Sequence, residues 1–146
     1  MEQVTPAIRD LARLLLAVEA HRSGHPEGEA HAAQSAFELL GLHLSKLVGV
    51  AGLQALLVRA LAMAKPEASW LAAVRVQGDA TLEGFSETAQ QQSAEAIAEG
   101  SAALLAQLLG LLVTFIGEAL TLRLVRGAWP EAQLEDRNLG AEETSA

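Results

Sequence analysis

The stretch Gly100–Gly117, GSAALLAQLLGLLVTFIG, decides the fold of this chain. Its 18 residues contain no charge and no proline, and their large apolar residues recur at spacings of three and four. That spacing predicts an α-helix, which we expect to run from Ala94 to Arg126 over roughly 50 Å at about 1.5 Å per residue. Gly127 is then expected at the position that ends the helix, and Pro130 prevents its continuation.

The predicted helix has two faces of different character. Its stripe of large residues is wider than the usual 100°, which indicates coverage on most sides and predicts that Leu108, Leu111 and Phe115 are buried. The opposite strip holds small and polar residues. Because a glycine inside a helix costs about 1 kcal/mol relative to alanine, a close helix crossing is a physical reason to keep one there. We therefore expect an interface that contains Ala103, Gly110, Thr114 and Gly117, either between two copies or within one chain. The alternative is that the glycines mark only a bend or drift in sequence.

An uncharged run of 18 residues also reaches the length that spans a hydrocarbon core of about 30 Å. Its alanine, serine, glutamine and glycine residues add little to transfer into lipid, Glu118 follows it directly, and no aromatic belt flanks it. These features favour the core helix of a soluble protein. The alternative is a membrane-associated protein that inserts an apolar helical hairpin made of residues 47–64 and 100–117.

The rest of the chain supplies helices that can surround this one. A first helix is expected from Pro6, capped by Thr5, to near residue 22. Two more are expected over 29–46 and 51–64, separated by a tight corner at the glycines of 48–52, with Leu47 on the core face. The predicted fold is all-α, a compact bundle of four or five helices around the long helix at about 94–126.

One segment is expected to form a small β-hairpin, at about 74–83. Apolar and polar residues alternate over Val74–Gln77 and again over 81–83, and Gly78-Asp79 supplies a turn between them. A lone hairpin is only marginally stable in water, so it should pack on the helices. We expect residues 1–130 to form a single helical domain and residues 131–146 to form an acidic, flexible tail.

Composition excludes several classes of function. The chain has no cysteine, which excludes disulfides and thiolate catalysis. Residues 1–65 carry six basic and six acidic side chains and are neutral overall. Residues 66–146 carry four basic and twelve acidic side chains, so the whole net charge of −8 lies in this half. No cluster of Lys and Arg is present to bind phosphates, so nucleic acid is not an expected partner. The N-terminus shows no secretory signal, so we expect a cytoplasmic protein. The chain is rich in Ala, Leu, Arg and Gly and poor in Lys, which suggests a bacterial source.

Few residues suggest chemistry. His21, His25 and His31 are weak candidates for metal ligands, but Gly24 and Pro26 break any helix that would align them, so a solvated loop is the better interpretation. The chain contains no GxGxxG, P-loop or GxSxG motif. We therefore expect no enzyme activity and no cofactor. The remaining candidates for buried polar residues are Glu118 and Arg59, and either solvent or a partner such as Arg59 would satisfy the Glu118 carboxylate.

These patterns favour a small cytoplasmic helical module that acts through protein–protein contact. We expect a homodimer, or a complex with another protein, with a regulatory or scaffolding role. The support is the excess of apolar helix surface together with the absence of catalytic motifs. Besides the membrane hypothesis, a second alternative is a helical sensor that binds a small molecule in an aliphatic pocket between helices.

Overall fold

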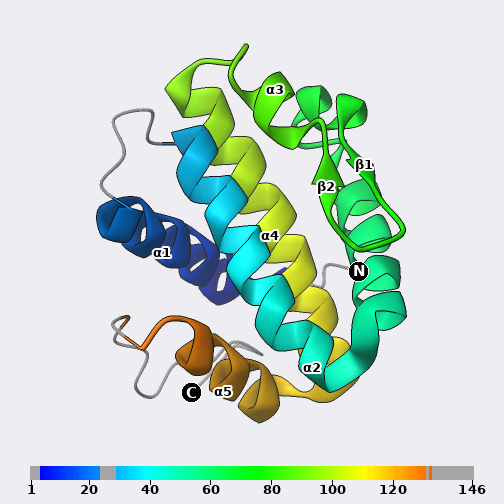
Figure 1. Cartoon of the computed structure of the whole chain (residues 1–146). Helices are drawn as coiled ribbons and strands as arrows, with labels where there is room; N and C mark the ends of the chain where they lie inside the picture. Colours follow the sequence, from blue (N-terminus) through cyan, green and yellow to red (C-terminus); the bar gives the residue numbers. More distant parts are fainter. Residues whose placement is uncertain (1–3, 24–28, 131, 133–146) are drawn as a thin grey trace.

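The fold is an all-α bundle with one minor hairpin, as the sequence predicts (Figure 1). The computed structural model describes residues 4–23, 29–130 and 132. Within them it has five α-helices, one short 3₁₀ helix and one two-stranded sheet. In chain order these are α1 (Pro6–Ser23), α2 (Glu29–Ala64), η1 (Ser69–Ala73), β1 (Arg75–Val76), β2 (Leu82–Glu83), α3 (Phe85–Ala89), α4 (Ala94–Ile116) and α5 (Glu118–Ala128). The tail expected over 131–146 lies outside the described residues, except for Ala132, which is buried.

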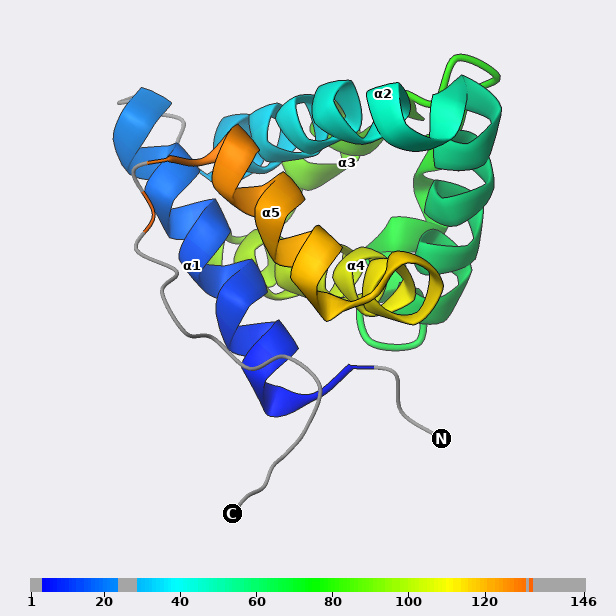
Figure 2. The same ribbon diagram turned by 90° about the horizontal axis from the view of Figure 1, so that it is seen from below.

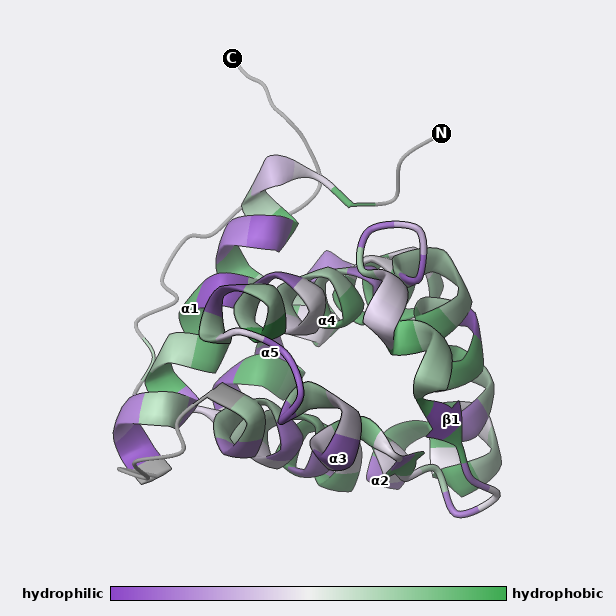
Figure 3. Ribbon diagram, turned by 90° about the horizontal axis from the view of Figure 1, so that it is seen from above, coloured by the Kyte–Doolittle hydropathy of each residue, from purple (hydrophilic) through white to green (hydrophobic). Residues whose placement is uncertain are grey.

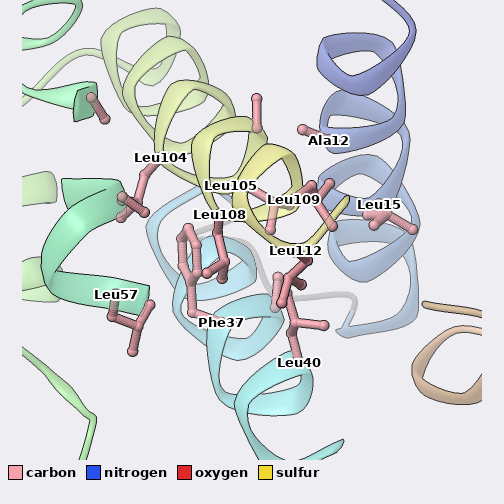
Figure 4. Packing of buried hydrophobic residues seen from close by; sticks show 14 of the residues in the cluster. Ala12, Leu15, Phe37, Leu40, Leu57, Leu104, Leu105, Leu108, Leu109 and Leu112 are labelled. Atoms are coloured by element: carbon pink, nitrogen blue, oxygen red, sulfur yellow. The ribbon is translucent and has the colours of Figure 1, made fainter. Parts of the chain in front are cut away.

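Helix α4 is the centre of the bundle. Every residue from Gly100 to Leu112 is buried, because α4 packs chiefly against α2 on one side and α1 on the other. Figure 4 shows its leucines between Ala12 and Leu15 of α1 and the apolar side chains of α2. Ser93 caps the helix by accepting a hydrogen bond from the backbone N–H of Ala96 at 3.0 Å. The uncharged run is therefore the core of the fold.

The long helix predicted over 94–126 is wrong in one respect, because it breaks at Gly117. This glycine has φ 91° and ψ 158°, a backbone conformation that is essentially restricted to glycine. Its N–H donates to the Val113 carbonyl at 3.0 Å and ends α4, and its carbonyl accepts from the Thr121 N–H at 3.0 Å at the start of α5. Helix α5 then turns back towards α1 (Figure 2) and passes through Gly127, which is helical and does not end it.

The break also explains why one core prediction is wrong. Leu108 and Leu111 are 1% and 0% exposed, as expected, but Phe115 is 62% exposed. Its predicted burial assumed that the helix continues straight and keeps its apolar stripe under cover. Because the chain turns at Gly117, the last turn of α4 lies at the edge of the bundle.

Helix α2 bends at a second glycine of the same kind. Gly49 has φ 80° and ψ 165°, close to the values at Gly117, and it divides α2 into two arms set at an angle (Figure 1). The corner predicted over 48–52 is confirmed. Leu47, which was assigned to the core, is 46% exposed because it lies directly before the bend, where the helix no longer faces the bundle.

The hairpin predicted near 74–83 is confirmed, with Arg75 opposite Glu83 and Val76 opposite Leu82. It is anchored to the helices by the aromatic residues beside it. Phe85 lies 5.6 Å from the ring of Trp70 and 5.8 Å from that of Phe37 in α2, measured between ring centroids. The indole N–H of Trp70 donates to the Ala96 carbonyl of α4 at 3.3 Å. This aromatic cluster therefore ties the hairpin region to both major helices.

The C-terminal end of the described chain is fastened to α1. Trp129 is fully buried, and its indole N–H donates to the Glu19 carboxylate at 3.0 Å. Glu19 is 6% exposed and also pairs with Arg22 at 3.5 Å. This carboxylate is covered because the chain after α5 brings Trp129 onto this face of α1.

Candidate interaction surface

The strip on α4 that was predicted as an interface does not form one continuous surface. Ala103 is 2% exposed and Gly110 is buried, within the stretch of α4 that packs chiefly against α2 and α1. Thr114 is exposed, and its hydroxyl donates to the Gly110 carbonyl at 3.0 Å. Gly117 is half-buried at the corner. The part of the strip that contains Ala103 and Gly110 is therefore buried within the chain and is not available to a second copy.

The residues considered for chemistry are not brought together. His21 and His31 are exposed, and His25 lies outside the described residues. Among residues 4–23, 29–130 and 132, no group of three or more His, Cys, Asp or Glu side chains is arranged to hold a metal ion. Glu118 is half-buried in the first turn of α5, whereas Arg59 is exposed on α2. The predicted buried pair is wrong for Arg59, because the outer face of α2 is not covered.

A polar cluster joins three elements on another side of the bundle. Glu67, just after α2, accepts a hydrogen bond from Arg9 of α1 at 3.0 Å and another from the Gln107 amide of α4 at 3.3 Å. The Arg9–Glu67 ion pair is only partly exposed. These contacts fix the end of α2 against α1 and α4, and the cluster contains no nucleophile.

The feature of the surface that stands out is the apolar face of α2. In the described part of the chain five large apolar side chains are exposed, and four of them belong to α2: Leu42 at 59%, Leu47 at 46%, Val50 at 50% and Val58 at 49%. Figure 3 colours each residue by its hydropathy, and most residues of this helix are hydrophobic. The sequence showed that α2 is apolar, but not which side of it the bundle would leave open.

A groove of about 240 Å³ is lined by both arms of α2 and by the β1–β2 turn. Figure 1 shows the angle between these two arms and the hairpin beside them. Its floor is apolar and buried, with Phe37, Leu53 and Leu57 each less than 8% exposed. Leu42 and Val50 form its exposed apolar rim. A buried apolar floor beside exposed apolar side chains is typical of a pocket that receives an anchor residue from a partner.

The polar groups around this groove are already hydrogen-bonded to one another. The Gln34 amide donates to Glu38 at 3.2 Å on the α2 side. On the turn, the hydroxyl of Thr81 donates to Asp79 at 2.7 Å and its backbone N–H donates at 3.2 Å. These two hydrogen bonds hold the pKa of Asp79 below its ordinary value of 3.8, so its carboxylate is ionised at neutral pH. The groove therefore offers apolar contact area, and the polar side chains beside it already have hydrogen-bond partners.

No known protein family, curated protein or solved structure matches this chain.

Proposed function

We propose that this protein is a small cytoplasmic helical interaction module without enzyme activity, which forms a homodimer through the outer face of α2 and serves a regulatory or scaffolding role. The observation that carries the proposal is the contrast between the two most apolar helices. Of the most apolar 18 residues in each, 78% are buried in α4 but only 28% in α2. A soluble protein rarely leaves such a helix uncovered, so α2 requires a partner.

Two properties of α2 favour a second copy of the chain as that partner. The net charge of −8 arises from residues 66–146, whereas the 36 residues of α2 carry two acidic and two basic side chains. Two acidic copies therefore meet with least repulsion through α2. In addition, its second arm exposes three alanines and one valine at spacings of four, three and four, and the alanines let two helix backbones approach closely. These residues are Ala51, Ala55, Val58 and Ala62.

A lipid surface is the competing occupant of this face. Two helices, Ala30–Ala64 and Ala94–Ile116, are long and apolar enough to cross a membrane, by length and composition alone. Insertion of 100–117 would require α4 to leave α1 and α2, against which most of it is buried. Burial in the core explains the composition of α4, and a dimer explains that of α2 without this unpacking.

The test is the mass in solution of the wild-type protein and of two matched variants. Light scattering should give twice the chain mass of 15.3 kDa for the wild type. Val58→Glu places a charge at the centre of the proposed contact and should give a folded monomer, because Val58 is half exposed and contributes little to the core. Phe115→Glu alters an exposed apolar side chain outside α2 and should leave the dimer intact.

Three results would overturn the proposal. They are a wild-type monomer at the highest soluble concentration, a Val58→Glu dimer, and protein that purifies only in detergent. The last, together with flotation on phosphatidylcholine vesicles, would assign the face of α2 to lipid.

A further inference from the structure

A second concavity, distinct from the groove on α2, lies between α1, the beginning of α2 and the first half of α4. Its volume is about 430 Å³, within the range of sites that bind small molecules. It exists because the three helices face one another with alanines, whose methyl groups are too short to fill the space. Ala33 forms part of the buried wall, while Ala17 and Ala98 are exposed at the opening.

The uncharged polar residue that lines this cleft, among the described residues, is Ser101 of α4. Its side chain is 1% exposed, and its hydroxyl has no hydrogen-bond partner among the described residues. Other hydroxyls on helices of this chain are satisfied: those of Thr114 and Thr121 donate to the carbonyl four residues earlier, at 3.0 and 2.8 Å. A buried hydroxyl without a partner is unfavourable, and an oxygen atom of a ligand in the cleft would relieve it.

The lining specifies the kind of ligand. It contains alanine and leucine but no aromatic side chain among the described residues, so it offers methyl groups for an alkyl chain and no ring on which to stack. Among the described residues, the charged ones that line it are Arg13 and Glu99, whose charges cancel. Arg13 is 60% exposed and already pairs with Asp10 at 3.7 Å, so the cleft does not select for a charged head group.

We propose that this cleft binds a medium-chain aliphatic molecule whose uncharged oxygen accepts a hydrogen bond from the Ser101 hydroxyl. The alkyl chain lies along the alanines of α1, α2 and α4. Such a ligand contacts three helices at once and therefore stabilises the bundle when it binds. This site does not involve the outer face of α2, so its occupancy and the oligomeric state are separate measurements.

The probes are straight-chain primary alcohols from 1-hexanol to 1-nonanol, with binding measured by calorimetry and by the shift in melting temperature. Each added methylene should lower Kd roughly fourfold until the chain fills the cleft, after which the gain should stop. Ala98→Leu should abolish binding because the larger side chain enters the opening. Ala119→Leu, at an exposed alanine of α5 outside the cleft, should bind 1-octanol as the wild type does.

Ser101→Ala gives the sharper readout, because it acts in opposite directions on binding and on stability. It should weaken 1-octanol binding about fivefold while raising the melting temperature of the ligand-free protein, since it removes an unpaired buried hydroxyl. Ala17→Leu, on the other wall, serves as the cleft-filling variant if Ala98→Leu does not fold. Absence of saturable binding to the wild type, unchanged binding in the cleft-filling variant, or unchanged 1-octanol binding in Ser101→Ala would each overturn the assignment.

Discussion

The sharpest consequence of the packing concerns Gly100, near the start of the buried part of α4. A β-carbon added at this position would lie 2.5 Å from Cζ2 of Trp70 and 2.7 Å from Cε2 and Nε1 of the same ring. Real β-carbon contacts are essentially never that short. The indole cannot simply swing away, because its N–H is bonded to the Ala96 carbonyl and its ring packs against Phe85.

The expected magnitude follows from two opposing effects. In a helix interior, Gly→Ala normally stabilises by about 0.5–1 kcal/mol, because alanine loses less backbone entropy on folding. Overpacking a filled site costs about 1–3 kcal/mol, and a displaced Trp70 would also lose a hydrogen bond of about 1 kcal/mol. We therefore expect Gly100→Ala to destabilise the protein by roughly 1–3 kcal/mol in total. The sign is opposite to the one that helix propensity predicts.

Gly127 of α5 is the matched control. It is also helical, but its added β-carbon would meet only the ring of His43 at 3.7 Å, an ordinary van der Waals contact. Gly127→Ala should therefore stabilise the protein by up to about 0.5–1 kcal/mol, as propensity alone predicts. The comparison separates the contact with Trp70 from any general effect of replacing glycine in these helices.

The assay is urea unfolding followed by circular dichroism at 222 nm, at one protein concentration for all variants. In thermal unfolding the loss should lower the melting temperature by about 2–4 °C per kcal/mol. In a Trp70→Ala background the clash is absent, so Gly100→Ala should become neutral or stabilising, and the double-mutant cycle should give a coupling energy above about 1 kcal/mol. A Gly100→Ala protein as stable as the wild type, or a coupling energy near zero, would refute the reasoning.

Three further predictions concern the core, the corner at Gly117 and the β1–β2 turn. Leu111→Ala should cost about 2–5 kcal/mol, whereas Phe115→Ala, one turn further along α4, should cost under about 1 kcal/mol, measured by urea unfolding. Gly117→Ala should cost about 1–3 kcal/mol through its positive φ alone, since nothing lies within 4 Å of the added β-carbon; a melting temperature equal to that of the wild type would contradict this. Thr81→Val should raise the pKa of Asp79 towards 3.8, as read from an NMR titration of the carboxyl carbon. In the wild type this carboxylate contributes stability above pH 3.8, and the contribution is lost as the pH falls through the lowered pKa.

Local patterns were sufficient where the structure depends on neighbours along the chain. Thr5 caps α1 as expected, with its hydroxyl accepting from the Ile8 N–H at 3.1 Å. The hairpin near 74–83 follows from alternation and a turn, and the buried leucines of α4 follow from helical spacing. The cap and the hairpin depend on interactions that span only a few residues. The leucines of α4 are covered by α1 and α2, but their helical spacing already shows which of them share a face.

The candidate surfaces were much less predictable. The strip on α4 that was expected as an interface is partly buried within the chain, while the exposed face of α2 and the cleft beside Ser101 became visible only in three dimensions. Leu42 and Leu40 are both leucines in one helix, yet one is 59% exposed and the other fully buried. Which of them needs a partner depends on where the other helices pack, and helical spacing does not record that.

The sequence by itself determined that a long uncharged helix would lie at the centre of an all-α bundle, because an apolar run of that length must be covered. Only the tertiary structure decided where that helix ends. Gly110 is helical within α4, whereas Gly117 ends the helix, although both glycines belong to the same uncharged run. A glycine permits a positive φ without requiring it. The turn at Gly117 is selected because it directs α5 back across the bundle, where Trp129 is buried and its indole reaches Glu19 of α1.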